Sequence, residues 1–245
     1  MKADPEAQRR LLDLQSIDTA LAQNAHRRRH LPELAELDRL AQELSALDGE
    51  RVRVQVSMDD IDRDIARLER DIEQVRARAD KDRARLDAGT GPAKELEALQ
   101  HELGTLARRQ SELEDAELEL LEQREQVQAD LDTVGQRLEK ARAERADAES
   151  RRAVAIGGLD HDRDERAGAR APLVDTIPAD LVALYEKIRE STGIGAALLR
   201  GGRCEGCHLE LSGSERSRVK AAAADEVIRC DECRRILVRT PESGL

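Results

Sequence analysis

The apolar residues in the first half of the chain recur with alternating steps of four and three. From residue 54 onward the repeat consists of Val54, Met58, Ile61, Ile65, Leu68, Ile72, Val75 and Ala79. This spacing is that of a coiled-coil seam, where one face of a helix packs along another helix. A chain that keeps this repeat over many turns is expected to fold mainly as long paired helices.

The composition agrees with an elongated helical protein. The 245 residues include one tyrosine, Tyr185, but no Phe or Trp, and 38% of them are charged. Aromatic side chains normally supply much of the buried area of a rounded core. Abundant Ala, Leu, Glu and Arg are typical of long helices, and the regular spacing of the aliphatic residues argues against disorder.

A second seam follows the segment "DAGTGPAK", whose glycines and proline predict a turn near residues 87–92. The simplest solution is an antiparallel hairpin, either within one chain or exchanged between two. The first arm, residues 33–86, would be about 80 Å long. The second seam comprises Leu96, Leu99, Leu103, Leu106, Leu113, Leu120, Val127, Leu131, Val134 and Leu138.

Polar residues interrupt this second seam. Such residues either fix the register at a cost in stability or mark a place where the helix meets water or another subunit. The positions are Gln110, Glu117, Arg124, Arg145 and Arg152.

The rest of the helical part is less regular. The first 30 residues carry a shorter stripe of Leu11, Leu14, Ile17 or Asp18, and Leu21. Pro32 predicts a kink near residue 32. Glycines and charges over residues 156–173 indicate a linker or a fraying helix, and Pro178 fits the first turn of a further helix.

These signals predict a mostly α protein with a long antiparallel coiled-coil hairpin, and the four paired cysteines near the end of the chain add a small C-terminal zinc ribbon. We expect a helical domain over residues 1–172, a connecting helix over 173–194 and the ribbon over 195–245.

Two CxxC pairs carry the clearest chemistry: Cys204 with Cys207, and Cys230 with Cys233. Each pair turns two thiolates toward one ion, and two pairs complete a tetrahedron around Zn²⁺. A redox CxxC would need a βαβ setting that this sequence lacks, and iron is a minor alternative. Four sulfur ligands leave no position for substrate, so one structural ion is expected, with His208 as a neighbour.

The surrounding segments predict short strands at "AALLRGGRC", "EVIRC" and "CRRILVR", with a helix between them capped by Ser212 or Ser214. So small a segment buries little surface. Zinc binding would supply stability on the order of 10 kcal/mol.

Four segments together resemble a bacterial family that joins a long coiled coil to a four-cysteine zinc ribbon. They are "KELEALQHEL", "LVALYEKIRE", "CEGCHLEL" and "CDECRRIL". The resemblance covers essentially the whole chain and implies that the four cysteines bind zinc. It also implies a nucleic-acid-binding or regulatory role.

Charge restricts where nucleic acid would bind. Residues 1–170 carry 30 basic and 40 acidic side chains, whereas residues 200–239 carry 9 and 7. Contact with phosphates is therefore expected at the ribbon. The candidate nucleic-acid-binding residues are Arg200, Arg203, Arg229, Arg234, Arg235 and Arg239.

No catalytic motif is apparent, because "GTGPAKEL" lacks the P-loop spacing and the five histidines are scattered. The sequence predicts a non-enzymatic cytoplasmic adaptor with no membrane span and no small-molecule substrate. Its partner would be RNA or DNA at the ribbon, with the coiled coil as spacer or docking rod. The alternative is a protein-interaction scaffold that acts through the coiled coil.

Overall fold

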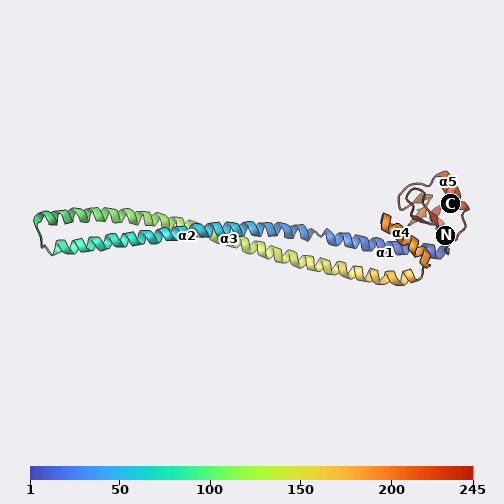
Figure 1. Cartoon of the computed structure of the whole chain (residues 1–245), viewed down its shortest axis with the longest axis horizontal. Coiled ribbons are helices and arrows are strands. Elements are labelled where there is room, and N and C mark those ends of the chain that lie inside the picture. The colour runs from blue at the N-terminus through green and yellow to red at the C-terminus, as the bar shows by residue number, and fades with distance from the viewer. Residues whose placement is uncertain (245) are drawn as a thin grey trace. The chain divides into compact units, whose positions relative to one another are not determined.

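The computed structural model describes residues 1–244, so Leu245, the last residue of the expected ribbon, lies outside it. The expected fold class is confirmed: long helices precede a small four-stranded sheet (Figure 1). The long elements are α1 (Pro5–Arg29), α2 (Pro32–Asp87), α3 (Ala93–Asp175) and α4 (Ala179–Thr192). No helix within residues 1–244 is long and apolar enough to cross a membrane.

Residues 35–149 form one compact unit, in which α2 and α3 pair as a hairpin within the single chain (Figure 1). The turn between them contains Gly89 at a φ of +61°, a conformation that glycine adopts without strain. The buried seam side chains of this unit are Leu40, Leu47, Met58, Ile65, Ile72, Leu106, Leu113, Val134, Leu138, Ala141 and Ala148.

Packing in the hairpin is loose over part of α3. Between Leu113 and Val134 no side chain of α3 is fully buried. Two polar residues of the seam in or beside this stretch bond to neighbours: Gln110 donates to Glu114, and Arg124 to Asp62 on α2. Two of the five polar seam positions, Glu117 and Arg124, therefore lie in the stretch of α3 without a buried side chain.

The second compact unit comprises residues 1–34 together with 150–245. The structure thus groups the N-terminal helix with the ribbon, whereas the sequence placed it with the hairpin. The boundaries expected at residues 172 and 194 separate a helical domain, a connecting helix and the ribbon. That these parts fold independently stays a proposal.

Of the two expectations for residues 156–173, the linker is wrong and the helix is right, because α3 continues to Asp175. It runs through Gly157, Gly158 and Pro172, which individually disfavour helix. Packing against α1 offsets these preferences: Asn24 donates to the carbonyl of Leu159 at 2.8 Å. The break near residue 32 does occur, since α1 ends at Arg29 and α2 begins at Pro32.

The ribbon sheet has the order β2-β1-β4-β3. Strand β1 is parallel to β4 and antiparallel to β2, and β3 is antiparallel to β4. Helix α5 lies between β2 and β3, and Ser212 caps it by accepting from the Glu215 amide. The bounds are β1 (Ala196–Arg200), β2 (Arg203–Cys204), α5 (Gly213–Ala221), β3 (Ile228–Arg229), β4 (Ile236–Val238) and a 3₁₀ turn (Pro241–Ser243).

Successive strand residues face opposite sides of the sheet, and the ribbon uses both sides. Ala196, Ile236 and Val238 join a core with α1 and α4, whereas Leu199 and Leu237 pack toward the cysteines. The ribbon therefore shares its hydrophobic core with the adjacent helices.

The N-terminal residues also hold the ribbon. The Ala3 amide donates to the backbone carbonyl of Asp225 at 2.7 Å, and the Val227 amide donates to the backbone carbonyl of Met1 at 3.1 Å. Lys2 forms an ion pair with Asp225 at 3.0 Å. The first residues of the chain thus form an isolated antiparallel bridge between Lys2 and Glu226.

Candidate metal centre

The two cysteine pairs occupy matching turns. In each turn the amide of the residue after the second cysteine donates to the carbonyl of the first: His208 to Cys204 at 2.7 Å, and Arg234 to Cys230 at 2.9 Å. His208 and Arg234 have φ values of +60° and +63°. The ribbon therefore contains two copies of one local structure, each aiming a pair of thiols at a common point.

All four sulfurs lie within 4.8 Å of one another. The Sγ atoms are 3.9 Å apart in the pairs Cys204–Cys233 and Cys207–Cys230. A tetrahedral Zn²⁺ with bonds of about 2.3 Å places its sulfurs about 3.8 Å apart. The cysteines thus fit one zinc ion, as the sequence predicted.

Burial keeps two of the thiols protonated when no metal is bound. It raises the pKa of Cys204 to about 12 and that of Cys230 to about 11. Burial acts in the same direction on Cys233, but hydrogen bonds from the Arg235 amide and the neighbouring thiols outweigh it and lower the pKa. Zinc must displace these protons, so its apparent affinity should rise with pH.

The centre is closed to substrate, because four protein sulfurs complete a tetrahedron. His208 is exposed, and its Nδ1 lies 4.0 Å from a carboxylate oxygen of Glu205. It is not among the clustered ligand atoms. The site accordingly has the chemistry of a structural centre.

The six candidate arginines divide into two groups. Arg200, Arg203, Arg229 and Arg234 are exposed. Arg235 and Arg239 are half-buried and serve the ribbon itself. Arg235 donates to the carbonyl of Gly206 at 2.6 Å. Arg239 donates to the carbonyls of Val219, Ala222, Ala223, Ala224 and Glu226.

Two exposed arginines hold equivalent positions in the two cysteine turns. Arg203 directly precedes Cys204, and its Nε donates to the carbonyl of His208 at 2.6 Å. Arg229 directly precedes the other pair, and its Nε donates to the carbonyl of Arg234 at 2.8 Å. Each contact fixes the orientation of a guanidinium through its Nε and leaves the two Nη groups available to donate hydrogen bonds to a ligand. Arg200 is instead paired with Glu242 at 2.9 Å.

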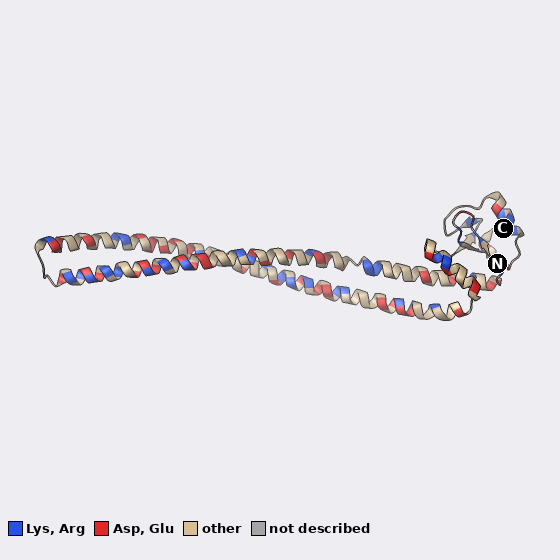
Figure 2. Ribbon diagram, in the orientation of Figure 1, with Lys and Arg blue, Asp and Glu red and all other residues tan. Residues whose placement is uncertain are grey.

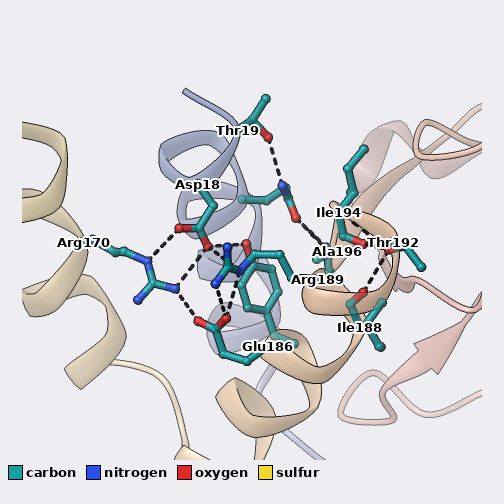
Figure 3. Close-up of polar contacts among 12 residues, drawn as sticks. Asp18, Thr19, Arg170, Glu186, Ile188, Arg189, Thr192, Ile194 and Ala196 are labelled. Carbon is teal, nitrogen blue, oxygen red and sulfur yellow. Dashed lines mark hydrogen bonds and ion pairs between the residues drawn. The ribbon is translucent and has the colours of Figure 1, made fainter. Parts of the chain in front are cut away.

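A buried polar cluster joins three helices beside the ribbon (Figure 3). Asp18 on α1 accepts from Arg170 on α3 at 2.7 Å and from the Tyr185 hydroxyl on α4 at 2.8 Å. Glu186 pairs with both Arg170 and Arg189. Burial, followed by the Asp18 carboxylate, raises the pKa of Tyr185 well above its usual range, so the hydroxyl remains a donor.

Sequence reasoning missed this cluster, although one signal was present. Asp18 falls within the apolar stripe of the first helix, and its side chain is only 4% exposed. An acidic residue at a core position requires a buried partner. The sequence did not identify Arg170, because α3 was not expected to extend so far.

The cluster is connected to the ribbon through Gln15 and Gly195. The Gln15 Oε1 atom accepts from the Gly195 amide at 2.6 Å. A Cβ atom at residue 195 would lie 2.5 Å from the Tyr185 ring, so only glycine fits there. These contacts fix the start of β1 against α1 and α4.

Two domain families match the chain. The CT398-like coiled coil hairpin domain matches residues 14–193, and the C4-type zinc ribbon domain matches residues 203–237. The chain belongs to the CT398-like coiled-coil hairpin family. The family resemblance predicted from the sequence is thereby confirmed, as is its pairing with a four-cysteine ribbon.

Relatives with the same arrangement occur in mycobacteria. An uncharacterised protein of Mycobacterium tuberculosis is 40% identical over 98% of both chains. One from Mycobacterium leprae is 30% identical over 89% of this chain and 94% of the relative. A solved structure from Mycobacterium smegmatis has a TM-score of 0.86 at 38% identity, covering 98% of this chain and 100% of that one.

A more distant family structure shows the fold alone. CT398 from Chlamydia trachomatis has a TM-score of 0.67 at 18% identity, covering 95% of this chain and 97% of that one. The hairpin-plus-ribbon architecture therefore persists across wide sequence divergence.

Proposed function

We propose that this protein is a zinc-ribbon adaptor that binds the backbone of RNA or DNA through its ribbon. The coiled-coil hairpin and the zinc ribbon support a non-enzymatic structural or interaction role. In the proposal the hairpin serves as a spacer or as a rod on which a partner docks. The four free cysteines suit the reducing cytoplasm.

The repeated arginine of the cysteine turns carries this proposal. Arg203 and Arg229 are both exposed, and both are oriented through Nε. A guanidinium held in this way presents its remaining donors in the fork geometry that suits phosphate. Exposed Arg234 adds positive charge to the same domain, whereas Arg200 is paired with Glu242.

The neighbouring groups determine the kind of binding. Exposed acidic residues, including Glu210, Asp231 and Glu232, lie close in sequence to the arginines, and the ribbon sequence contains no aromatic residue on which bases could stack. Binding should therefore be directed at the backbone, weak in sequence preference and strongly dependent on salt.

The test compares the double variant Arg203→Ala/Arg229→Ala with Arg83→Ala/Arg85→Ala, which removes the same charge from exposed positions of α2. Fluorescence anisotropy would follow binding of labelled single- and double-stranded oligonucleotides to zinc-loaded protein across salt concentrations. The ribbon variant should lower the slope of log affinity against log salt by roughly one for each phosphate that it no longer neutralises. Equal behaviour of the two variants, or no binding at low salt, would refute the proposal.

The hairpin provides a second candidate function, a protein-interaction scaffold. The observation in its favour is that two leucines of α3, Leu118 and Leu121, are exposed at 60% and 40%. Two neighbouring exposed leucines give α3 a small apolar surface that a partner could cover.

A further inference from the structure

Eight positions on the hairpin form a surface that we call the acidic leucine face. Each position directly follows a seam residue, so the four on each helix share one stripe at helical spacing. The α2 stripe is Asp62, Ala66, Glu69 and Glu73, and the α3 stripe is Glu114, Leu118, Leu121 and Glu125.

The two stripes lie on the same side of the hairpin. In an antiparallel pair, the residues that follow the seam on one helix lie beside those that follow it on the other. Two contacts set the pairing: Arg124 to Asp62 and Arg76 to Glu114, both at 2.6 Å. They bring residues 62–76 alongside residues 114–124, with Ala66 opposite the region of Leu121.

The leucines of this face lie on a part of α3 that buries little of its own surface. Between Leu113 and Val134 no α3 side chain is buried, although Ile65 and Ile72 of the facing α2 stretch are. Exposed Ala66, in the α2 stretch opposite Leu121, has only a methyl group with which to cover it. A further helix laid here would cover both leucines.

The charge on the face is mainly negative. Five of its eight residues are carboxylates. Two of these are neutralised across the hairpin: Asp62 by Arg124, and Glu114 by Arg76, which is the next position of the α2 stripe. Glu69, Glu73 and Glu125 are exposed and form no ion pair within the described residues 1–244. Figure 2 shows the charged residues distributed along both helices of the unit.

We propose that the acidic leucine face docks an amphipathic helix of a partner protein, with an apolar stripe flanked by Lys and Arg. The proposal deepens the second candidate function and rests on it. The apolar stripe would cover Leu118 and Leu121, while the flanking cations would pair with the free carboxylates. A second copy of the same face fits poorly, because it would set carboxylate against carboxylate.

The probe is a synthetic helical peptide of about three heptads with leucine at a and d and lysine at e and g. Its binding to the full-length zinc-loaded protein would be measured by fluorescence anisotropy. The double variant Leu118→Ser/Leu121→Ser should weaken peptide binding by about tenfold or more. Made separately, Glu69→Lys/Glu125→Lys should weaken peptide binding more than the leucine variant does and should reduce the salt dependence of binding.

Matched controls distinguish binding at this face from nonspecific attraction of the peptide to an acidic protein. Val52→Ser/Val56→Ser removes two exposed apolar side chains of α2 outside the face and should leave peptide binding unchanged. A peptide with glutamate in place of lysine should not bind. Circular dichroism would verify that all variants keep the helical content of the parent.

Three outcomes would overturn the proposal. The first is equal peptide binding by the leucine and valine variants. The second is binding by the glutamate peptide. The third is a dimer in sedimentation that Leu118→Ser/Leu121→Ser dissociates, which would make a second copy the occupant. Nucleic-acid binding by the leucine variant should be normal, so failure here is distinguishable from failure of the ribbon proposal.

Discussion

The ribbon with its supporting helices and the hairpin are stabilised in different ways. In the unit with the ribbon, strands β1 and β4 pack on α1 and α4, a buried carboxylate is surrounded by arginines and a tyrosine, and four cysteines converge on one point. In the hairpin, two helices share a narrow seam with a poorly buried middle and charged pairs on its surface. Stability therefore depends on a few specific groups in one unit and on many small contributions in the other.

Removal of zinc should have the largest effect on stability, and it should unfold the ribbon while leaving the hairpin folded. Structural zinc contributes on the order of 10 kcal/mol in small zinc domains. Treatment with a chelator, or the substitution Cys204→Ser, should make residues 195–240 sensitive to protease while the hairpin stays helical by circular dichroism. Protease resistance that survives metal removal would show that the core shared with α1 and α4 holds the ribbon alone.

The next largest effect is expected at the buried carboxylate. Asp18→Ala removes the carboxylate that accepts from both Arg170 and the Tyr185 hydroxyl. The buried hydroxyl is then unpaired, while Arg170 keeps Glu186. Losing these hydrogen bonds to a charged group should cost about 3 kcal/mol, measurable as a lower free energy of unfolding in denaturant. Asp13→Ala, at an exposed position of the same helix, should have little effect. Similar destabilisation in both variants would contradict a specific role for the cluster.

Intermediate effects are expected in the hairpin seam, and they should depend on position. Leu138 is 2% exposed, so Leu138→Ala should lower the free energy of unfolding by about 2 kcal/mol or more. Leu120 lies in the thin stretch and is half-buried, so Leu120→Ala should cost clearly less. Thermal unfolding followed by circular dichroism would rank the two, and the reverse order would show that the loose stretch is packed in solution.

The smallest effect is expected for surface pairs of the hairpin. Arg137 lies 3.1 Å from Glu50 on the facing helix, and the arginine side chain is 54% exposed. Arg137→Ala should change the free energy of unfolding by no more than about 1 kcal/mol. A larger decrease in the same thermal assay would mean that interhelical pairs, rather than the seam, hold the hairpin.

The same contrast explains what the sequence could predict. Heptads and paired CxxC motifs are local, repetitive signals, so the hairpin, its turn and the zinc ligands were all predicted from spacing. Asp18 and Arg170 are 152 residues apart, and no local pattern in either segment predicts that the two side chains meet. Arg235 and Arg239 resembled phosphate ligands by charge, although the structure engages them with backbone carbonyls.

The long sequence separation within the unit that contains the ribbon has a consequence for how the chain folds. Asn24 must meet Leu159, 135 residues away, and closing so long a loop costs on the order of 4 kcal/mol in chain entropy. The hairpin, made of residues continuous in sequence, can form as soon as its second arm has been synthesised. Once formed, it brings residues 35 and 149 close together and shortens that search. The part of the molecule with the weakest packing would then serve as the folding template for the part with the strongest.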